Sequence, residues 1–206
     1  MSKINYEFHI TVIDADKDPF ISFCSRIGVK PILLELQDSE NIVLLHDVMT
    51  SHHSEFNSDE LAMIELKRVS SLLQNAGFNV VREKIEADIN HPDVIKNKEI
   101  STCPNYFETH FNILISENEE DTLRAIAAKN DCHFSRNIFK KIENEYTIMI
   151  TKRVYSGTGD EFKSIVAEIE EELTKSNLRI EKTIIEYAIF DTKEDWDSEW
   201  LNSTQE

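Results

Sequence analysis

Polar and apolar residues alternate along two short segments of the chain, residues 6–12 and 107–113. Alternation over this length predicts a β-strand with one apolar face and one polar face. The two segments also match each other, because Glu7 and His9 recur as Glu108 and His110 at an offset of 101 residues. The predicted polar faces carry Glu7, His9 and Thr11 on the first strand, and Glu108, His110 and Asn112 on the second.

Two longer segments have the periodicity of amphipathic helices and repeat at an offset of 100 residues. The first covers residues 58–76 and the second covers residues 160–176. Their apolar stripes are formed by Ala62, Leu66, Val69 and Leu73, and by Phe162, Val166, Ile169 and Leu173. The stop signals repeat as well, since Gly77 and Asn177 are both residues that tolerate the left-handed conformation after a helix.

The remaining elements complete the same order in each half. Short helices are predicted at 17–27 and 118–130. Further strands are predicted at 30–36, 42–49 and 80–88 in the first half, and at 133–139, 146–154 and 180–189 in the second. Each half therefore has the β-α-β-β-α-β order of a ferredoxin-like unit. The predicted fold class is α+β, an internal duplication of two ferredoxin-like halves whose antiparallel sheets enclose a polar cleft.

The duplication defines the expected domain organisation. The first repeat spans residues 1–90 and the second spans residues 106–190. Residues 91–105 contain two prolines and few large apolar residues, which is typical of a linker. Residues 191–206 are expected to form an acidic tail, in which Trp196 and Trp200 pack onto the body of the protein.

The composition argues against several classes of function. Acidic residues outnumber basic ones by 39 to 22, and the resulting net charge of −17 repels nucleic-acid phosphates and anionic membranes. No apolar run is long enough for a membrane span or a signal peptide, and four glycines form no phosphate-binding loop motif. Three cysteines without a CxxC spacing indicate reduced thiols. We expect a cytoplasmic monomer or homodimer that binds neither membranes nor nucleic acids in general.

The polar sheet faces are the candidate site. A solvated sheet face is the simple alternative, but Glu, His and Glu recur at matching places in both halves. Buried charges need partners or a ligand, so two facing polar sheets predict a ligand site or a catalytic site. The residues assigned to ligand binding are Glu7, Arg82, Lys84, Glu108, Asn112, Arg136, Arg153 and Lys182. The expected ligand is a small anionic molecule, and no cofactor is expected.

One family resemblance concerns the first strand. The segment Phe8-His9-Ile10-Thr11-Val12 resembles the apolar-His-apolar-Thr/Ser-apolar strand of the two-histidine phosphoesterases, which are also bilobal. The resemblance implies that His9 and His110 act as general acid and base without a metal ion, and that Thr11 holds a phosphate oxygen. The second half departs from the family pattern, because Asn112 stands where Thr or Ser is required.

A second resemblance implies different chemistry. The stretch from His9 to Asp14, followed by residues 28–32, looks like the opening of a module of the vicinal oxygen chelate proteins, the glyoxalases and extradiol dioxygenases. In that family a metal ion sits between paired modules, held by residues of the first and last strands. The resemblance implies a divalent metal ion held by His9, Glu86, His110 and Glu186. Modules of that family lack the long helix predicted at 58–76 and 160–176.

Three functions therefore remain open. The chain can bind a small phosphorylated or nucleotide-type ligand and act on it as a metal-independent phosphoesterase. It can be a metal-dependent enzyme of the chelate type. It can also bind or sequester a ligand without chemistry. The adjacent His52 and His53 are expected in a surface loop before the long helix rather than at a metal site.

Overall fold

The structure is a computed structural model that describes residues 3–37, 43–89, 91–96, 100, 105–142 and 145–193. For residues 34–37, 43–47 and 136–142 only the main chain is described. The first half contains β1 (Ile4–Ile13), α1 (Lys17–Ile27), β2 (Lys30–Gln37), β3 (Val43–Phe56), α2 (Asp59–Asn75) and β4 (Asn79–Asp88). The second contains β5 (Tyr106–Ser116), the 3-10 turn η1 (Glu117–Glu119), α4 (Glu120–Lys129), β6 (His133–Ile142), β7 (Glu145–Val154), α5 (Gly159–Lys175) and β8 (Arg179–Asp191). The short helix α3 (Pro92–Ile95) lies between the halves.

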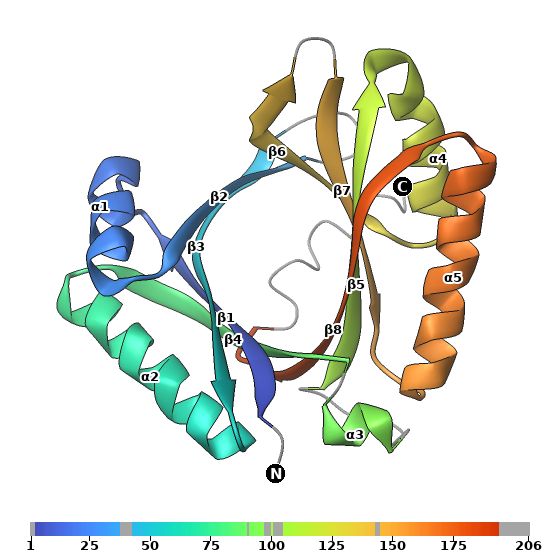
Figure 1. Cartoon of the computed structure of the whole chain (residues 1–206). Coiled ribbons are helices and arrows are strands. Elements are labelled where there is room, and N and C mark those ends of the chain that lie inside the picture. The colour runs from blue at the N-terminus through green and yellow to red at the C-terminus, as the bar shows by residue number, and fades with distance from the viewer. Residues whose placement is uncertain are drawn as a thin grey trace.

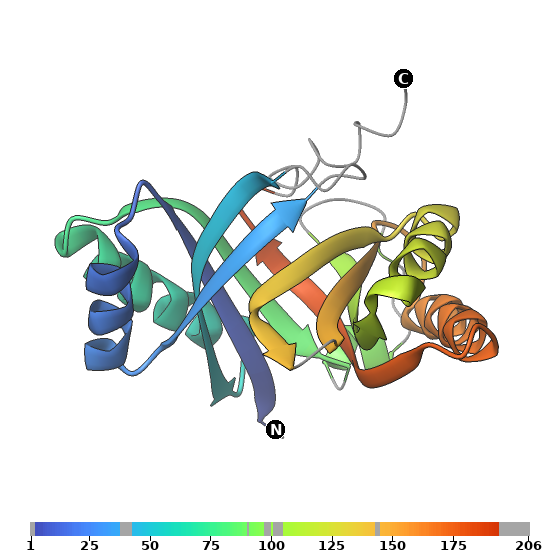
Figure 2. The same ribbon diagram turned by 90° about the horizontal axis from the view of Figure 1, so that it is seen from above.

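The strands form one closed barrel in the order β1-β3-β2-β6-β7-β5-β8-β4. Within each half the strand order is that of a ferredoxin-like sheet, which confirms the predicted fold class. The halves join at two places, where β4 pairs with β8 and β2 pairs with β6, both antiparallel. Figure 1 shows α1 and α2 outside one side of the ring, and α4 and α5 outside the opposite side. The view from above in Figure 2 shows the same two groups of helices flanking the barrel.

Each half has its own apolar core, located between the outer face of its sheet and its helices. In the first half, Leu66 and Leu73 of α2 pack in one cluster with Phe8 and Ile10 of β1. The second half has the matching cluster, which includes the apolar stripe predicted for α5. Because the apolar residues of each strand face the helices, the alternating polar residues face the inside of the barrel.

The helix ends agree with the sequence pattern. Gly77 follows α2 with a φ of 91°, and Asn177 follows α5 with a φ of 57°. A left-handed residue at this position closes the last turn of a helix by turning the chain away from the axis. The repeated stop signal therefore has the same structural cause in both halves. No helix in the described part of the chain is long and apolar enough to cross a membrane.

The strand β3 is longer than predicted, and this corrects one interpretation. It extends to Phe56, so His52 and His53 belong to the barrel rather than to a surface loop. The ring of His52 faces the helices and stacks on Phe8 with centroids 4.6 Å apart. Within the predicted linker, Ile100 forms an isolated bridge with Gly157. The predicted acidic tail begins at Asp191, which is the last residue of β8, and Trp196 and Trp200 lie outside the described residues.

The packing of α2 generates a stability prediction. Replacing the fully buried Leu66 with Ala removes apolar contacts and leaves a cavity, so we expect a loss of about 2–5 kcal/mol in unfolding free energy. The matched control is Leu61→Ala on the same helix, where the side chain is 44% exposed and the expected loss is small. Urea denaturation of both variants measures the difference. Equal losses would contradict the assignment of this face to the core.

Candidate functional site

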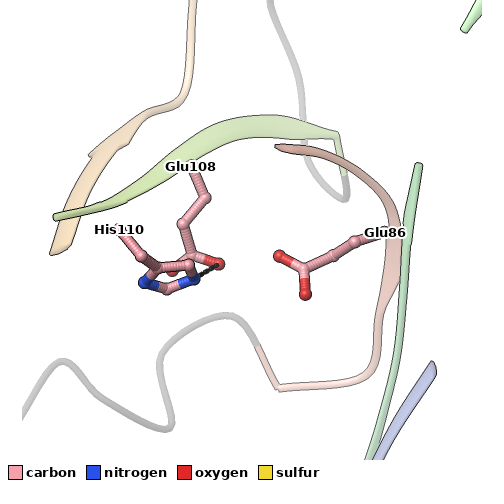
Figure 3. Close-up of side chains that lie close together, drawn as sticks. All are labelled: Glu86, Glu108 and His110. Carbon is pink, nitrogen blue, oxygen red and sulfur yellow. Dashed lines mark ion pairs between the residues drawn. The ribbon is translucent and has the colours of Figure 1, made fainter. Parts of the chain in front are cut away.

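The inward-facing side chains from both halves meet inside the barrel. They come from β1, β3, β4, β5, β7 and β8, and they are mostly charged. The inward side chains nearest the centre include Glu7, His9, Ser51, Lys84, Glu86, Glu108, His110, Thr151, Arg153 and Glu186. Figure 3 shows Glu86 directed toward Glu108 and His110, although these residues belong to different halves. The two polar faces therefore form one site, and His9 and His110 are both part of it.

His9 lies against two carboxylates. Its Nε2 is 3.1 Å from Glu86 Oε2 and 3.4 Å from Glu7 Oε1, and the side chain is 17% exposed. Burial by itself would lower the pKa of His9, but the hydrogen bond and charge of Glu86, together with the charge of Glu7, outweigh it and raise the pKa. His9 is thus favoured as a charged imidazolium. Its Nδ1 is buried and has no hydrogen-bond partner among the described residues.

Glu7 is held in its ionised form by several groups around it. Burial acts to raise its pKa, but the charge of His9 and a hydrogen bond from Ser51 lower the pKa overall. Ser51 Oγ donates to Glu7 Oε1 at 2.6 Å. His53, which lies at the barrel rim with a 57% exposed side chain, places its Nε2 3.4 Å from Glu7 Oε2. His9 and Glu7 therefore form a charged pair on the inner face of β1.

His110 has different surroundings, although it is the counterpart of His9. Its Nδ1 is 2.8 Å from Thr151 Oγ1, and its Nε2 is 3.5 Å from Glu186 Oε2. Burial lowers the pKa of His110. The charges of Glu108 and Glu86 act in the opposite direction, but burial, together with the charges of Lys84 and Arg153, outweighs them, so the neutral imidazole is favoured. Burial and the negative charges of Glu86 and Glu7 raise the pKa of Glu186 to about 10. At neutral pH, His110 and Glu186 are therefore a neutral pair.

A buried ion network links the two halves at the centre of the barrel. The ammonium group of Lys84 lies 2.7 Å from Glu86 Oε1 and forms an ion pair with Glu108. Arg153 forms a second ion pair with Glu108, whose side chain is fully buried. Although burial opposes both charges, the surrounding opposite charges hold the pKa of Lys84 well above its usual range and the pKa of Glu108 well below it.

A second buried network lies near the end of β8. Arg82 donates two hydrogen bonds to Asp191, from Nε at 2.9 Å and from Nη2 at 2.6 Å. Tyr106 also donates to Asp191 from its hydroxyl at 2.8 Å. All three residues are buried. Arg82 was assigned to ligand binding from the sequence, but in the structure its guanidinium group is paired with Asp191.

The predicted residues Thr11, Asn112 and Lys182 lie further from the centre. Thr11 is buried on the inner face of β1, opposite Arg82 in register. Asn112 is half-buried on β5, and Lys182 lies opposite it in register and is exposed. The side chain of Arg136 is outside the described part of the chain. The structure therefore brings together the two predicted histidines with the predicted Glu7, Lys84, Glu108 and Arg153.

Sequence reasoning missed several inward residues. Ser51 lies opposite His9 in register, and Thr151 lies opposite His110. The two residues are 100 positions apart, so the repeat could have marked them as equivalent inward positions. Tyr106 and Asp191 carried no such signal, since their contact is set by the pairing of β8 with β4 and β5. The duplication is also broken at the centre of the barrel. Lys84 lies opposite His9 in the register of β4 and β1, whereas Ile184 lies opposite His110 in the register of β8 and β5.

One group of side chains has the composition of a metal site. A ligand atom from each of Glu86, Glu108 and His110 lies within 4.8 Å of the others. Two carboxylates and an imidazole suit a divalent ion. The metal ligands implied by the second family resemblance are His9, Glu86, His110 and Glu186, so two of them, Glu86 and His110, belong to this group. The ammonium group of Lys84 contacts both carboxylates and already neutralises part of their charge.

Comparisons with known proteins add little. No family model and no curated protein matches the chain. Among solved structures, an unknown protein from Galdieria sulphuraria is 11% identical, with 90% of this chain and 99% of that chain covered and a TM-score of 0.29. The acetolactate synthase small subunit from Thermotoga maritima is 10% identical, with coverages of 91% and 96% and a TM-score of 0.25. A glycine cleavage system transcriptional repressor is 9% identical, with coverages of 91% and 98% and a TM-score of 0.27.

The raised pKa of Glu186 predicts how stability depends on pH. An unfolded glutamate has a pKa of about 4.3, so the folded state holds this proton more tightly than the unfolded state does. The stabilisation is complete below about pH 4 and is lost as the pH rises toward the folded pKa of about 10. The Glu186→Gln variant keeps a neutral side chain, so we expect it to be more stable than the natural protein at pH 8, with a smaller difference at pH 5.

Thermal unfolding at these two pH values measures the effect. The control is Glu168→Gln, because Glu168 is exposed on α5 and the substitution should leave the pH dependence of stability unchanged. If Glu186→Gln showed the same pH dependence as the natural protein, Glu186 would be ionised in the folded state, and the neutral pairing with His110 would be wrong.

Proposed function

We propose that the barrel interior binds a small organic anion and catalyses proton transfer on it, with His9 as the general acid and His110 as the general base. The observation that carries this proposal is the contrast between the two imidazoles. His9 lies 3.1 and 3.4 Å from the carboxylates of Glu86 and Glu7, which raise its pKa. His110 lies 3.5 Å from Glu186 and 3.8 Å from Glu108, but there burial outweighs the carboxylate charges and lowers the pKa. Two titratable groups with opposite protonation states in one site form an acid–base pair.

The geometry supports a role for each imidazole. If His110 carries its proton on Nδ1, it donates to Thr151 Oγ1 at 2.8 Å. Its Nε2, which faces Glu186 and Glu108, is then unprotonated and can accept a proton from a ligand. His9, as an imidazolium, can donate from Nε2, which already faces the interior carboxylate of Glu86. The side chains of His9 and His110 are 17% and 18% exposed, so solvent reaches both. Thr151 acts as a positioning residue because it fixes the ring of His110.

The carboxylates limit the ligands that the site can take. Glu86 contacts His9 and lies within 4.8 Å of the ligand atom of His110. A phosphodiester bound between the two rings would face this carboxylate at close range, and like charges at short distance are costly. Phosphodiester hydrolysis is therefore less well supported than proton transfer on a ligand whose reacting part is neutral. A single anionic group on the ligand would have to lie away from Glu86.

The protonation states can be tested directly. We expect the imidazole signals of His9 to titrate above pH 6.5 and those of His110 below pH 6.5 in an NMR titration of the whole chain. Glu86→Gln removes the charge beside His9, so the pKa of His9 should fall. If the two rings titrated with the same midpoint, the acid–base assignment would be refuted.

The chemistry itself is tested by turnover. A panel of small carboxylates with acidic C–H bonds, together with phosphate esters and phosphodiesters, is incubated with the protein in EDTA. For any substrate turned over, His110→Asn should lower kcat by about 100-fold or more. Glu168→Gln is the control, because it is a conservative change on the exposed face of α5. Turnover that persisted in both His9→Asn and His110→Asn would remove the proposed roles, and binding without turnover would favour a non-catalytic binding protein.

A divalent metal ion is a second candidate, supported by the grouping of Glu86, Glu108 and His110. A metal ion there would compete with the ammonium group of Lys84 for both carboxylates, so we expect weak binding in the natural protein. A thermal-shift titration with manganese and zinc ions tests this, because specific binding to the folded state raises the melting temperature. The shift should disappear in Glu108→Gln and remain in the control Glu168→Gln. No shift with either ion would exclude this candidate.

A further inference from the structure

The two ends of the barrel are not equivalent, although the duplication relates them. Arg82 pairs with Asp191 at the end of β8, whereas its counterpart Lys182 lies near the beginning of the same strand. The two cations therefore mark opposite ends of the barrel. At the Arg82 end, the bidentate pair with Asp191 and the hydroxyl of Tyr106 form a buried cluster.

The opposite end lacks the corresponding contacts among the described residues. Lys182 is exposed, and within the described part of the chain no carboxylate forms an ion pair with it. The position that matches Tyr106 at an offset of 101 residues is the half-buried Asn5. A small polar side chain stands there in place of a buried aromatic ring. The end that contains Lys182 thus has an exposed cation and a smaller side chain at the places where the Arg82 end has a buried ion pair and an aromatic ring.

We infer that ligands enter the barrel at the Lys182 end, and that Lys182 and Asn112 bind the anionic group of the ligand there. This inference rests on the proposed function and identifies its ligand class as a small molecule with one oxyanion, either a carboxylate or a phosphate. Lys182 supplies the charge, and the amide of Asn112, which is its partner in register, supplies a hydrogen-bond donor.

The position of this subsite fits the chemistry at His110. Asn112 and His110 are two residues apart on the same face of β5, which corresponds to about 7 Å along a strand. An oxyanion at Lys182 would therefore place a reacting atom four or five bonds away, next to the Nε2 of His110. The oxyanion would also stay apart from the buried carboxylates of Glu86 and Glu108. The distance limits the ligand to a short chain with its charge at one end.

NMR titration of the whole, histidine-labelled chain tests the subsite with two probes, acetate and inorganic phosphate. We expect each probe to shift the imidazole signals of His110, and the tighter of the two identifies the oxyanion that the ligand carries. Lys182→Gln should weaken binding of the preferred probe by at least about threefold, and Lys182→Glu should weaken it more. The control is Lys163→Gln, an equal change of charge on the outer surface of α5, which should leave the affinity unchanged.

The possible outcomes separate this inference from the proposed function. Equal affinity in the natural protein and in Lys182→Gln would overturn the subsite, and so would the absence of any shift at His110 with either probe. Neither result depends on the titration midpoints of His9 and His110 or on turnover, which test the acid–base roles. Loss of affinity in Lys182→Gln with no loss in Lys163→Gln would support the inference.

Discussion

The structure depends on the burial of one ammonium group, that of Lys84, between carboxylates from both halves. Closing two amphipathic sheets into a ring turns every polar strand face inward, so charges that could be solvated in an open sheet lose much of their water. Glu108 is fully buried and is compensated by Lys84 from the other half and by Arg153 from its own. Burial keeps His110 neutral against the charges of Glu108 and Glu86, and Glu186 is left without a counter-charge of its own. The electrostatics of the site are thus a consequence of the closure of the barrel.

Much of the fold could be predicted from the sequence because its signals are local and occur twice. Alternation in the first strand of each half, the apolar stripes of α2 and α5, and the stop signals at Gly77 and Asn177 all depend on neighbouring residues. The inward faces of β1 and β5 follow from the same alternation, so the sequence alone assigns Glu7, His9, Glu108 and His110 to one site. The end of β3 was misjudged because polar residues such as His52 and His53 are typical of loops.

The parts that could not be predicted depend on contacts between distant segments. The two sheets form one ring because β4 pairs with β8. No residue type in either strand predicts this pairing from the sequence. The same pairing brings Asp191 to Arg82 and Tyr106. A charged residue after the last predicted strand looks like the start of a polar tail when only its neighbours are known. Register between distant strands is set by the whole barrel, so a pattern read along one segment cannot reveal it.

Joining the two halves in one chain has a consequence for the asymmetry at the barrel centre. Two separate copies of one half would be related by a two-fold axis, and every substitution would then occur twice in the assembled ring. Lys84 has no lysine counterpart, since Ile184 occupies the matching place, and Tyr106 is matched by Asn5. A symmetric dimer would have to place two ammonium groups or none among the same carboxylates. A single continuous polypeptide is free of that constraint. Its two imidazoles can therefore differ in protonation state, and the two ends of its barrel can carry different side chains.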